Sequence, residues 1–319
     1  MPVLVAPMAM QRLCHPEGEL AMARAAADAG VPMVVSTMAT ASLAEVAATG
    51  APLLWFQVYV LTRRDLTRRM IERAVAAGYK AIVVTVDAPR LGRREGDQRH
   101  RFALPPGLAL ANLEEEVQGE EEDAGKGKNE EGTPPGPPGG SGGGGSRPFA
   151  RRFTSLIDAS LTFEVIPWIK SFCPLPVLVK GILAPDDARR AVARGADGVI
   201  VSNHGGRQLD GAPAALDVLP AVAAAVAGRA PVLVDGGVRR GTDVLKCLAQ
   251  GAAAVLVGRP LLWALAVEGR RGVGAALGAL REEVELGMAL LGAASVGEVT
   301  PEVLLRPGAP SFRIPASRL

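Results

Sequence analysis

Residues 195–211 contain side chains that could carry out acid–base chemistry on a small anion. The segment includes a β-branched run over residues 199–201, which is typical of a strand. Ser202, His204 and Arg207 follow this run among glycines, which allow sharp turns and a close approach of the backbone to a ligand. Imidazole is well suited to moving protons near neutral pH, whereas an arginine supplies a fixed cation. The pattern predicts a strand that delivers a base and a cation to one place, although a purely structural histidine would fit it too.

Apolar runs typical of strands recur along the chain, with Ala- and Arg-rich helical patterns between them. Eight β units that alternate with helices favour a closed parallel (β/α)8 TIM barrel over a doubly wound sheet. The length of 319 residues suits a single barrel of this kind. The expected strands are residues 3–6, 33–36, 53–58, 81–86, 177–180, 198–202, 232–235 and 253–258.

Such a barrel builds its active site at the carboxyl ends of its strands. Polar side chains or glycines follow nearly every expected strand, which core packing does not explain. We therefore expect one site at this rim. It draws on Ala6, Pro7, Met8 and Ala9 after the first strand, Ser36 after the second, Gln57 and Tyr59 after the third, Thr85, Asp87 and Arg94 after the fourth, Lys180 after the fifth, Ser202, His204 and Arg207 after the sixth, Asp235, Gly236, Gly237 and Arg239 after the seventh, and Gly258 and Arg259 after the eighth.

The loops after the seventh and eighth expected strands have the composition of a phosphate site. Backbone amides of glycines and a nearby arginine are the donors that such barrels commonly use at this position. Gly236, Gly237, Arg239, Gly258 and Arg259 supply both kinds of donor. The sequence therefore predicts a cofactor or substrate that carries a phosphate.

Residues 202–211 read SNHGGRQLDG, and this string resembles the signature of the FMN-dependent L-2-hydroxy acid oxidase and dehydrogenase family, which includes glycolate and lactate oxidases. The resemblance extends over residues 3–307 with one insert. It implies that FMN is the cofactor and that an L-2-hydroxy acid is oxidised to the 2-oxo acid. Oxygen would accept the electrons and leave as hydrogen peroxide. It also implies a homo-oligomer, either a tetramer or an octamer.

The resemblance further implies how the strand-end residues divide their roles. Arg94 and Arg207 would bind the substrate carboxylate, Tyr59 would hydrogen-bond the substrate, and His204 would be the general base. Asp87 would stabilise the imidazolium form of His204, as an acid–base pair requires. Around the cofactor, Ala6, Pro7, Met8 and Ala9 would pack on the flavin, Ser36, Gln57 and Thr85 would hydrogen-bond its ring, Lys180 would lie beside N1 and the C2 carbonyl, and Ser202, Asp235 and the phosphate-site residues would complete the binding site.

Three residues bear on the substrate and on the electron acceptor. Met8 stands where glycolate oxidases usually have threonine, and Met38 stands where they usually have a tryptophan in the substrate pocket. A flexible methionine leaves a different space, which favours lactate or a longer 2-hydroxy acid over glycolate. At position 9 the chain has alanine, as the oxidases of the family do, and this supports oxygen as the acceptor.

Composition excludes several other classes of protein. Lys and Arg number 35 and Asp and Glu 33, so the net charge of +2 does not indicate a nucleic-acid-binding protein. Cys14, Cys173 and Cys247 are far apart and predict reduced, buried thiols, with neither a disulfide framework nor a metal site. The absence of a spanning apolar run or a leader pattern predicts a soluble, intracellular protein without a membrane segment.

Two segments differ from the barrel pattern. Residues 114–148 are first acidic and then rich in Gly and Pro, which predicts a disordered insert in the loop after the fourth strand. This insert could act as a lid or be a tolerated low-complexity expansion. We therefore expect a barrel over residues 1–307, interrupted by 114–148, and an extended tail over residues 308–319.

The two ends of the sequence give two further expectations. The chain begins at the expected first strand, so the N-terminal extension of the family, with a tyrosine that contacts the substrate carboxylate, would be missing. A non-catalytic or impaired flavin-binding relative is therefore one alternative function. Another FMN barrel, such as a type II isopentenyl diphosphate isomerase, is a second alternative, but it leaves the His-Gly-Gly-Arg string unexplained. Ser317, Arg318 and Leu319 form a variant of the Ser-Lys-Leu peroxisomal address, with the cytoplasm as the alternative location.

Overall fold

The computed structural model describes residues 1–113 and 155–305 of the chain. The expected disordered insert and the expected C-terminal tail, with Ser317, Arg318 and Leu319, lie outside the described residues.

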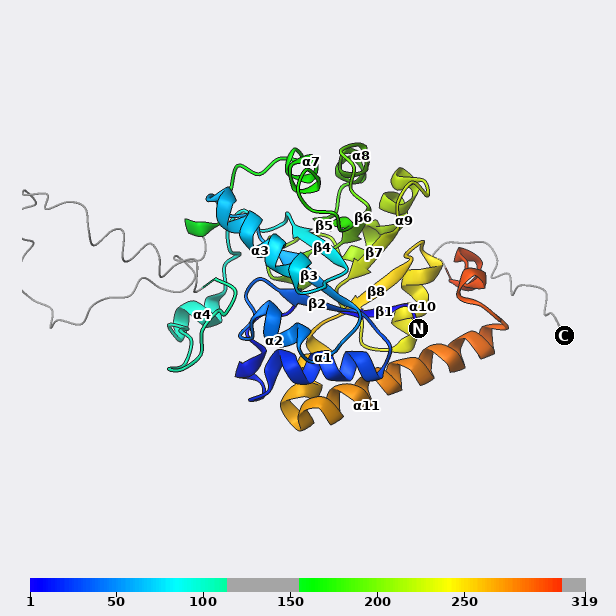
Figure 1. Ribbon diagram of the computed structural model, residues 1–319. Helices are drawn as coiled ribbons and strands as arrows, with labels where there is room; N and C mark the ends of the chain where they lie inside the picture. The colour runs from blue at the N-terminus through cyan, green and yellow to red at the C-terminus, as the bar shows by residue number, and fades with distance from the viewer. Residues whose placement is uncertain (114–154, 306–319) are drawn as a thin grey trace, which may run out of the picture.

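Eight parallel strands form a closed barrel, which confirms the predicted (β/α)8 fold (Figure 1). Each strand pairs with the next in the sequence, and β8 returns to pair with β1. Four of the expected runs are one residue too long at their carboxyl ends, whereas the fifth strand continues two residues past Lys180. The strands are β1 (Val3–Val5), β2 (Met33–Ser36), β3 (Leu54–Val58), β4 (Ala81–Thr85), β5 (Val177–Ile182), β6 (Gly198–Val201), β7 (Val232–Asp235) and β8 (Ala254–Val257).

Helices surround the barrel on its outer face. The long α11 lies beside α1 and bends where Glu268 and Gly269 leave helical geometry (Figure 1). The described helices are α1 (Gly18–Asp28), α2 (Leu43–Ala47), α3 (Arg64–Ala76), α4 (Glu95–Arg99), α7 (Val165–Lys170), α8 (Pro185–Ala193), α9 (Ala215–Val226), α10 (Gly241–Ala249) and α11 (Arg259–Leu291), with 3-10 turns η1 (Gln11–Leu13), η2 (His204–Gly206), η3 (Val296–Glu298) and η4 (Pro301–Val303). None of the helices in the described ranges is both long and apolar enough to cross a bilayer.

The core is aliphatic and has two layers, because successive side chains of each strand point to opposite faces of the sheet. In β1, Leu4 belongs to a buried cluster made almost only of strand residues, which fills the barrel. Its neighbours Val3 and Val5 belong to the larger cluster between the sheet and the helices. Because strand side chains alternate between the two faces, every strand contributes to both layers. This double burial explains why the strands appear as continuous apolar runs in the sequence.

The three cysteines are free thiols. Cys173 and Cys247 are buried as expected, and burial raises the pKa of Cys247 to about 12. The expectation of burial is wrong for Cys14, which is only partly covered because it borders the large cavity described below.

Candidate active site

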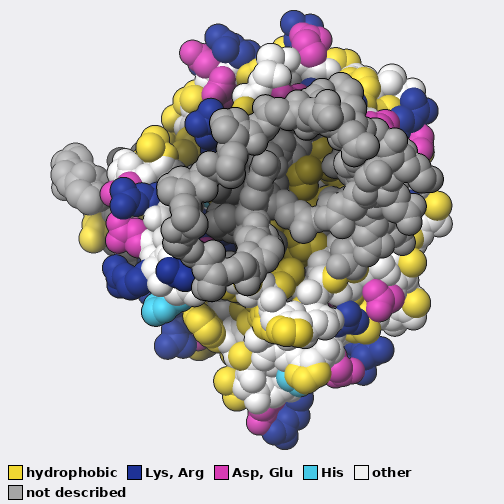
Figure 2. Space-filling model, turned by 90° about the vertical axis from the view of Figure 1, so that its left-hand side faces the viewer, with side chains coloured by type: hydrophobic (Ala, Val, Ile, Leu, Met, Phe, Trp, Pro, Cys, Tyr) yellow, Lys and Arg dark blue, Asp and Glu magenta, His cyan; other side chains and the backbone are white. Residues whose placement is uncertain are grey.

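A cavity of about 2280 Å³ opens at the carboxyl ends of the strands. This face of the molecule is hollowed, and hydrophobic side chains lie in the hollow (Figure 2). Its volume exceeds the roughly 300–1,000 Å³ of a usual ligand pocket, so a cofactor and a substrate can occupy it together. The predicted site residues that line it are Ala6, Pro7, Met8, Ala9, Ser36, Gln57, Tyr59, Thr85, Arg94, Lys180, His204, Arg207, Asp235, Gly236, Gly237, Arg239, Gly258 and Arg259.

Two predicted residues, Asp87 and Ser202, lie behind this lining. The Ser202 hydroxyl is buried and accepts hydrogen bonds from the Lys180 ammonium (3.0 Å) and from the backbone N–H of His204 (3.0 Å). Ser202 therefore holds two cavity residues in place. Its predicted direct contact with the cofactor stays a prediction.

His204 and Asp87 form a hydrogen-bonded pair. Nδ1 of His204 lies 2.9 Å from Oδ1 of Asp87, and the two side chains are 13% and 12% exposed. The other ring nitrogen, Nε2, lies 3.4 Å from the Tyr59 hydroxyl at the cavity wall. A carboxylate that holds Nδ1 leaves Nε2 available for proton transfer and stabilises the protonated ring.

The backbone around His204 is unusual. The backbone of His204 has a φ of 59°, which lies in the left-handed region that residues other than glycine rarely adopt. Gly205 and Gly206 follow with φ of 67° and 74°. The Asn203 side chain caps this tight turn by accepting the N–H of Gly206. The glycines of the motif therefore allow the turn that points the imidazole into the cavity, and strain of this kind is concentrated at functional sites.

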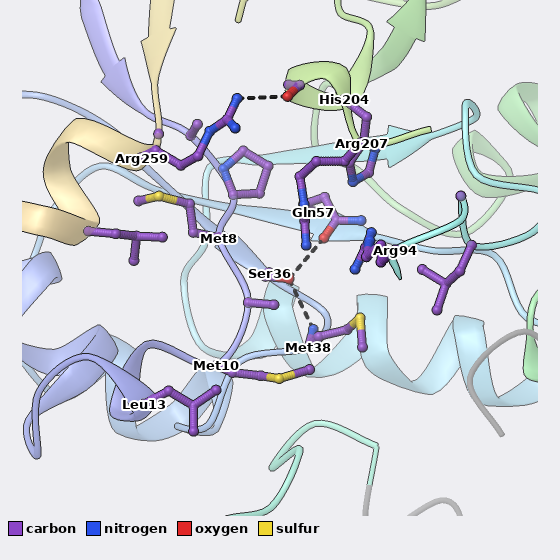
Figure 3. Close-up of a pocket in the computed structure, with 18 of the residues that line it drawn as sticks. Met8, Met10, Leu13, Ser36, Met38, Gln57, Arg94, His204, Arg207 and Arg259 are labelled. Atoms are coloured by element: carbon purple, nitrogen blue, oxygen red, sulfur yellow. Dashed lines mark hydrogen bonds between the residues drawn. The ribbon is translucent and has the colours of Figure 1, made fainter. Parts of the chain in front are cut away.

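Two arginines near His204 have no acidic partner within the described parts of the chain. Arg94 and Arg207 lie with His204 and Gln57 on one side of the cavity (Figure 3). The buried Nε of Arg94 lacks a hydrogen-bond partner there. Desolvation and the neighbouring cations Arg94 and Arg259 lower the pKa of Arg207. Cations with unused hydrogen-bonding capacity bind planar anions such as carboxylates.

Lys180 is buried and remains a cation. It forms an ion pair with Asp235 (Nζ to Oδ2, 3.1 Å). Burial by itself would lower the pKa of Lys180, but the carboxylates of Asp235 and Asp87 outweigh that effect and raise it. Lys180 thus supplies a fixed positive charge to the floor of the cavity, where negative charge on a bound group would be stabilised.

A row of hydrogen-bonding side chains runs across β2, β3 and β4. The Ser36 hydroxyl donates to Oε1 of Gln57 (3.3 Å), and Nε2 of Gln57 donates to the Thr85 hydroxyl (3.0 Å). Register pairs Ser36 with Gln57, so these side chains come from neighbouring strand ends. Such a row can hydrogen-bond the polar edge of a flat heteroaromatic ring.

The opposite end of the cavity can bind a phosphate. Gly236 and Gly237 have φ of 100° and 79°, which a residue with a side chain would adopt only under strain. Arg239 and Arg259 border the same space. Arg259 donates to the Gly205 carbonyl at 2.7 Å, so the start of α11 is connected to the turn of His204 (Figure 3). Buried Lys180, the row of polar side chains and this phosphate end together fit the ring and the phosphate of FMN.

Sequence reasoning missed several residues of the site. Gln208, which directly follows Arg207 in the motif, connects the loops after β4 and β6, and Gly181 makes room for Asp87. The position of Gln208 in the SNHGGRQLDG string was a signal that could have found it. Apolar residues of the cavity such as Met10, Leu104 and Leu110 carry no such signal, because they resemble core residues.

Comparison with known proteins agrees with this geometry. The profile of the FMN-dependent dehydrogenase family matches residues 1–306. L-lactate oxidase of Nostoc sp. is 50% identical over 308 residues, which cover 95% of this chain and 79% of the relative. Glycolate oxidase 1 of Oryza sativa subsp. indica is 47% identical over 300 residues, which cover 94% and 76%. The crystal structure of mandelate oxidase is similar with a TM-score of 0.80 at 45% identity, covering 94% of this chain and 77% of that one.

The matched region thus includes the described strands, both arginines near His204 and the phosphate end of the cavity. The chain belongs to the FMN-dependent dehydrogenase family, whose relatives include oxidases of 2-hydroxy acids.

Proposed function

We propose that this protein oxidises an L-2-hydroxy acid with an apolar side chain to the 2-oxo acid, with FMN as cofactor and oxygen as the final acceptor. The observation that carries this proposal is the His204–Asp87 pair, whose imidazole lines the same cavity as Arg94 and Arg207, two arginines that form no ion pair within the described residues. A base beside two cations suits a substrate that carries both a carboxylate and a hydroxyl group.

The side chains divide the work on the substrate. Arg94 and Arg207 bind its carboxylate, which orients C2 and its hydroxyl toward His204. Nε2 of His204 accepts a proton, and the Asp87 carboxylate stabilises the imidazolium that forms. Burial, assisted by Asp87, raises the pKa of Tyr59 despite the nearby cations, so its neutral hydroxyl can donate a hydrogen bond to the substrate.

FMN, when bound, supplies the two-electron acceptor. Ser36, Gln57, Thr85 and Lys180 are placed to hold its ring. The substrate loses two electrons and two protons as the C2–OH bond becomes a carbonyl, and one oxygen molecule takes up two electrons and two protons to give hydrogen peroxide.

The apolar part of the cavity supports a substrate larger than glycolate. Met10, Met38 and Tyr59 form a buried cluster against which Leu104 and Leu110 pack, and all five line the cavity. Met10 and Met38 lie on the side of the cavity away from Arg259 (Figure 3). Methionine side chains adapt to irregular apolar groups, so this wall suits an alkyl or aryl substituent on C2.

A visible spectrum of the purified protein, followed by anaerobic addition of substrates, tests the proposal. Yellow protein that is bleached faster by (S)-2-hydroxyhexanoate or (S)-mandelate than by glycolate is the expected result. Release of hydrogen peroxide when air is admitted would support oxygen as the acceptor. Yellow protein that no 2-hydroxy acid bleaches would favour a non-oxidising flavin barrel, and colourless protein that does not take up added FMN would refute the cofactor.

We also propose import into peroxisomes and assembly into a tetramer or an octamer. An oxidase that produces peroxide suits a compartment that destroys it, and Ser317-Arg318-Leu319 is similar to the import signal. A fluorescent protein fused ahead of the last ten residues should enter peroxisomes in eukaryotic cells, and a diffuse signal would contradict the proposal. Light scattering of the purified full chain tests the oligomeric state, and a monomer would contradict it.

A further inference from the structure

Gln208 connects the loop after β6 to the loop after β4 through three hydrogen bonds. Its Nε2 donates to the carbonyls of Asp87 (2.8 Å) and Arg90 (2.9 Å), and its Oε1 accepts the N–H of Gly92 (2.9 Å). A carboxamide is suited to this role because it carries both donors and an acceptor, whereas a carboxylate or an ammonium group carries only one kind.

The two loops touch directly at this place. A Cβ atom on Gly92 would lie 2.3 Å from the carbonyl oxygen of Arg207 and 2.7 Å from Cα of Gln208. Real side chains do not tolerate such contacts, so only a glycine lets the two backbones come this close. The three hydrogen bonds therefore belong to a packed junction between the loops.

Two functional pairs of the site have one member on each of these loops. Asp87 and Arg94 belong to the loop after β4, and their partners His204 and Arg207 belong to the loop after β6. The relative position of the loops thus sets both the His204–Asp87 hydrogen bond and the spacing of the two arginines. A misplacement of about 1 Å in such a constellation can reduce a rate by roughly 100-fold.

We propose that Gln208 is a positioning residue that holds the loop after β4 against the loop after β6, and so aligns Asp87 with His204 and Arg94 with Arg207. The proposal rests on the proposed function in so far as it concerns the reaction. Its structural part, the junction of the loops, is open to measurement in the absence of turnover.

Gln208→Met tests the proposal, because methionine has a similar length and volume but lacks the amide. Three properties of the holoenzyme are compared with wild type: amide hydrogen exchange of residues 87–94, affinity for oxalate measured from the flavin spectrum, and flavin reduction by the best 2-hydroxy acid. Oxalate is a suitable probe because it presents carboxylates and has no hydrogen to lose. Gln250→Met is the matched control, since Gln250 lies at the end of α10 away from the cavity.

In Gln208→Met we expect faster exchange over residues 87–94, oxalate binding weaker by about 10-fold, and flavin reduction slower by about 10- to 100-fold, with flavin content retained. Gln250→Met should match wild type in all three. The loss of rate in Gln208→Met/Asp87→Asn should be smaller than the product of the two single losses, because Gln208 acts through Asp87. If Gln208→Met does not fold, Gln208→Glu replaces it, since it keeps the acceptor and loses the donors.

Unchanged hydrogen exchange over residues 87–94 would overturn the claim that Gln208 holds the loop after β4 in place. Faster exchange with unchanged oxalate affinity and an unchanged rate of flavin reduction would overturn the positioning role. A double variant Gln208→Met/Asp87→Asn whose loss of rate equals the product of the two single losses would overturn it too. A wild-type flavin that no 2-hydroxy acid reduces would refute the proposed function instead, and exchange and oxalate binding would still decide whether Gln208 aligns the loops.

Discussion

Gly181 leaves the space that Asp87 occupies. A Cβ atom on Gly181 would lie 2.6 Å from both Cβ and Cγ of Asp87, and Gly181 has a φ of 108°. The register of β5 against β6 shifts between Lys180 and Ile182, so Gly181 sits in an irregularity of the strand. The Asp87 carboxylate can therefore reach His204 because residue 181 on the neighbouring strand β5 has no side chain.

Gly181→Ala should lower the rate of flavin reduction by roughly 100-fold, because the added methyl group must displace Asp87 from His204. Gly228→Ala is a matched control: Gly228 also has a positive φ (70°), but no atom lies within 4 Å of its added Cβ. The control should lose about 1–2 kcal/mol of stability and keep its rate. Stopped-flow reduction and thermal unfolding measure the two effects, and equal rates in both variants would contradict the proposed seat of Asp87.

His204→Gln should retain FMN and lose flavin reduction by about 10²- to 10⁴-fold, which is the usual contribution of a general base. Glutamine preserves polarity and much of the volume but cannot accept the proton. Flavin content from the visible spectrum and anaerobic reduction rates check the prediction. Near-normal reduction would remove His204 as the base.

Arg207→Lys should lower kcat/KM by about 10-fold or more with unchanged flavin content, because lysine keeps the charge and loses the planar pair of donors. Arg24→Lys is a control, because Arg24 forms an exposed ion pair with Glu17 and such pairs contribute little to stability. Steady-state kinetics of both variants test the expectation. If Arg207→Lys behaves like the control, the substrate carboxylate is bound elsewhere.

Met38→Trp should change the choice of substrate. Met38 is 6% exposed at the apolar wall of the cavity, so a larger, rigid ring there would occupy the space of a substrate side chain. We expect the ratio of kcat/KM for (S)-2-hydroxyhexanoate to that for glycolate to fall by about 10-fold or more, as expected for the loss of space for a few methylene groups. An unchanged ratio would place the substrate side chain against another wall.

Several features of this protein follow from the sequence alone, because they are encoded by local patterns. Continuous apolar runs identify strands that are buried on both faces, and eight of them predict the closed barrel. Since all parallel strands end at one rim, the residue after each run could be assigned to a common site. The motif around His204 resembles the signature of a known family, and this resemblance implied the cofactor and the class of chemistry.

Other features depended on the tertiary structure. Asp87 and His204 are 117 positions apart, and they come within 2.9 Å because β4 and β6 lie on either side of β5 in the barrel. Ser202 follows its strand like the other site residues, but the course of the backbone turns its hydroxyl behind the cavity wall toward Lys180. Gly181 and Gly92 act through segments that are distant in the sequence, so no local pattern reveals them. Gln208 belongs to the motif, but its hydrogen-bond partners in the loop after β4 do not. The physical reason is that sequence periodicity specifies which residues lie at a strand end, whereas contacts between loops and backbone torsions decide which way each side chain points.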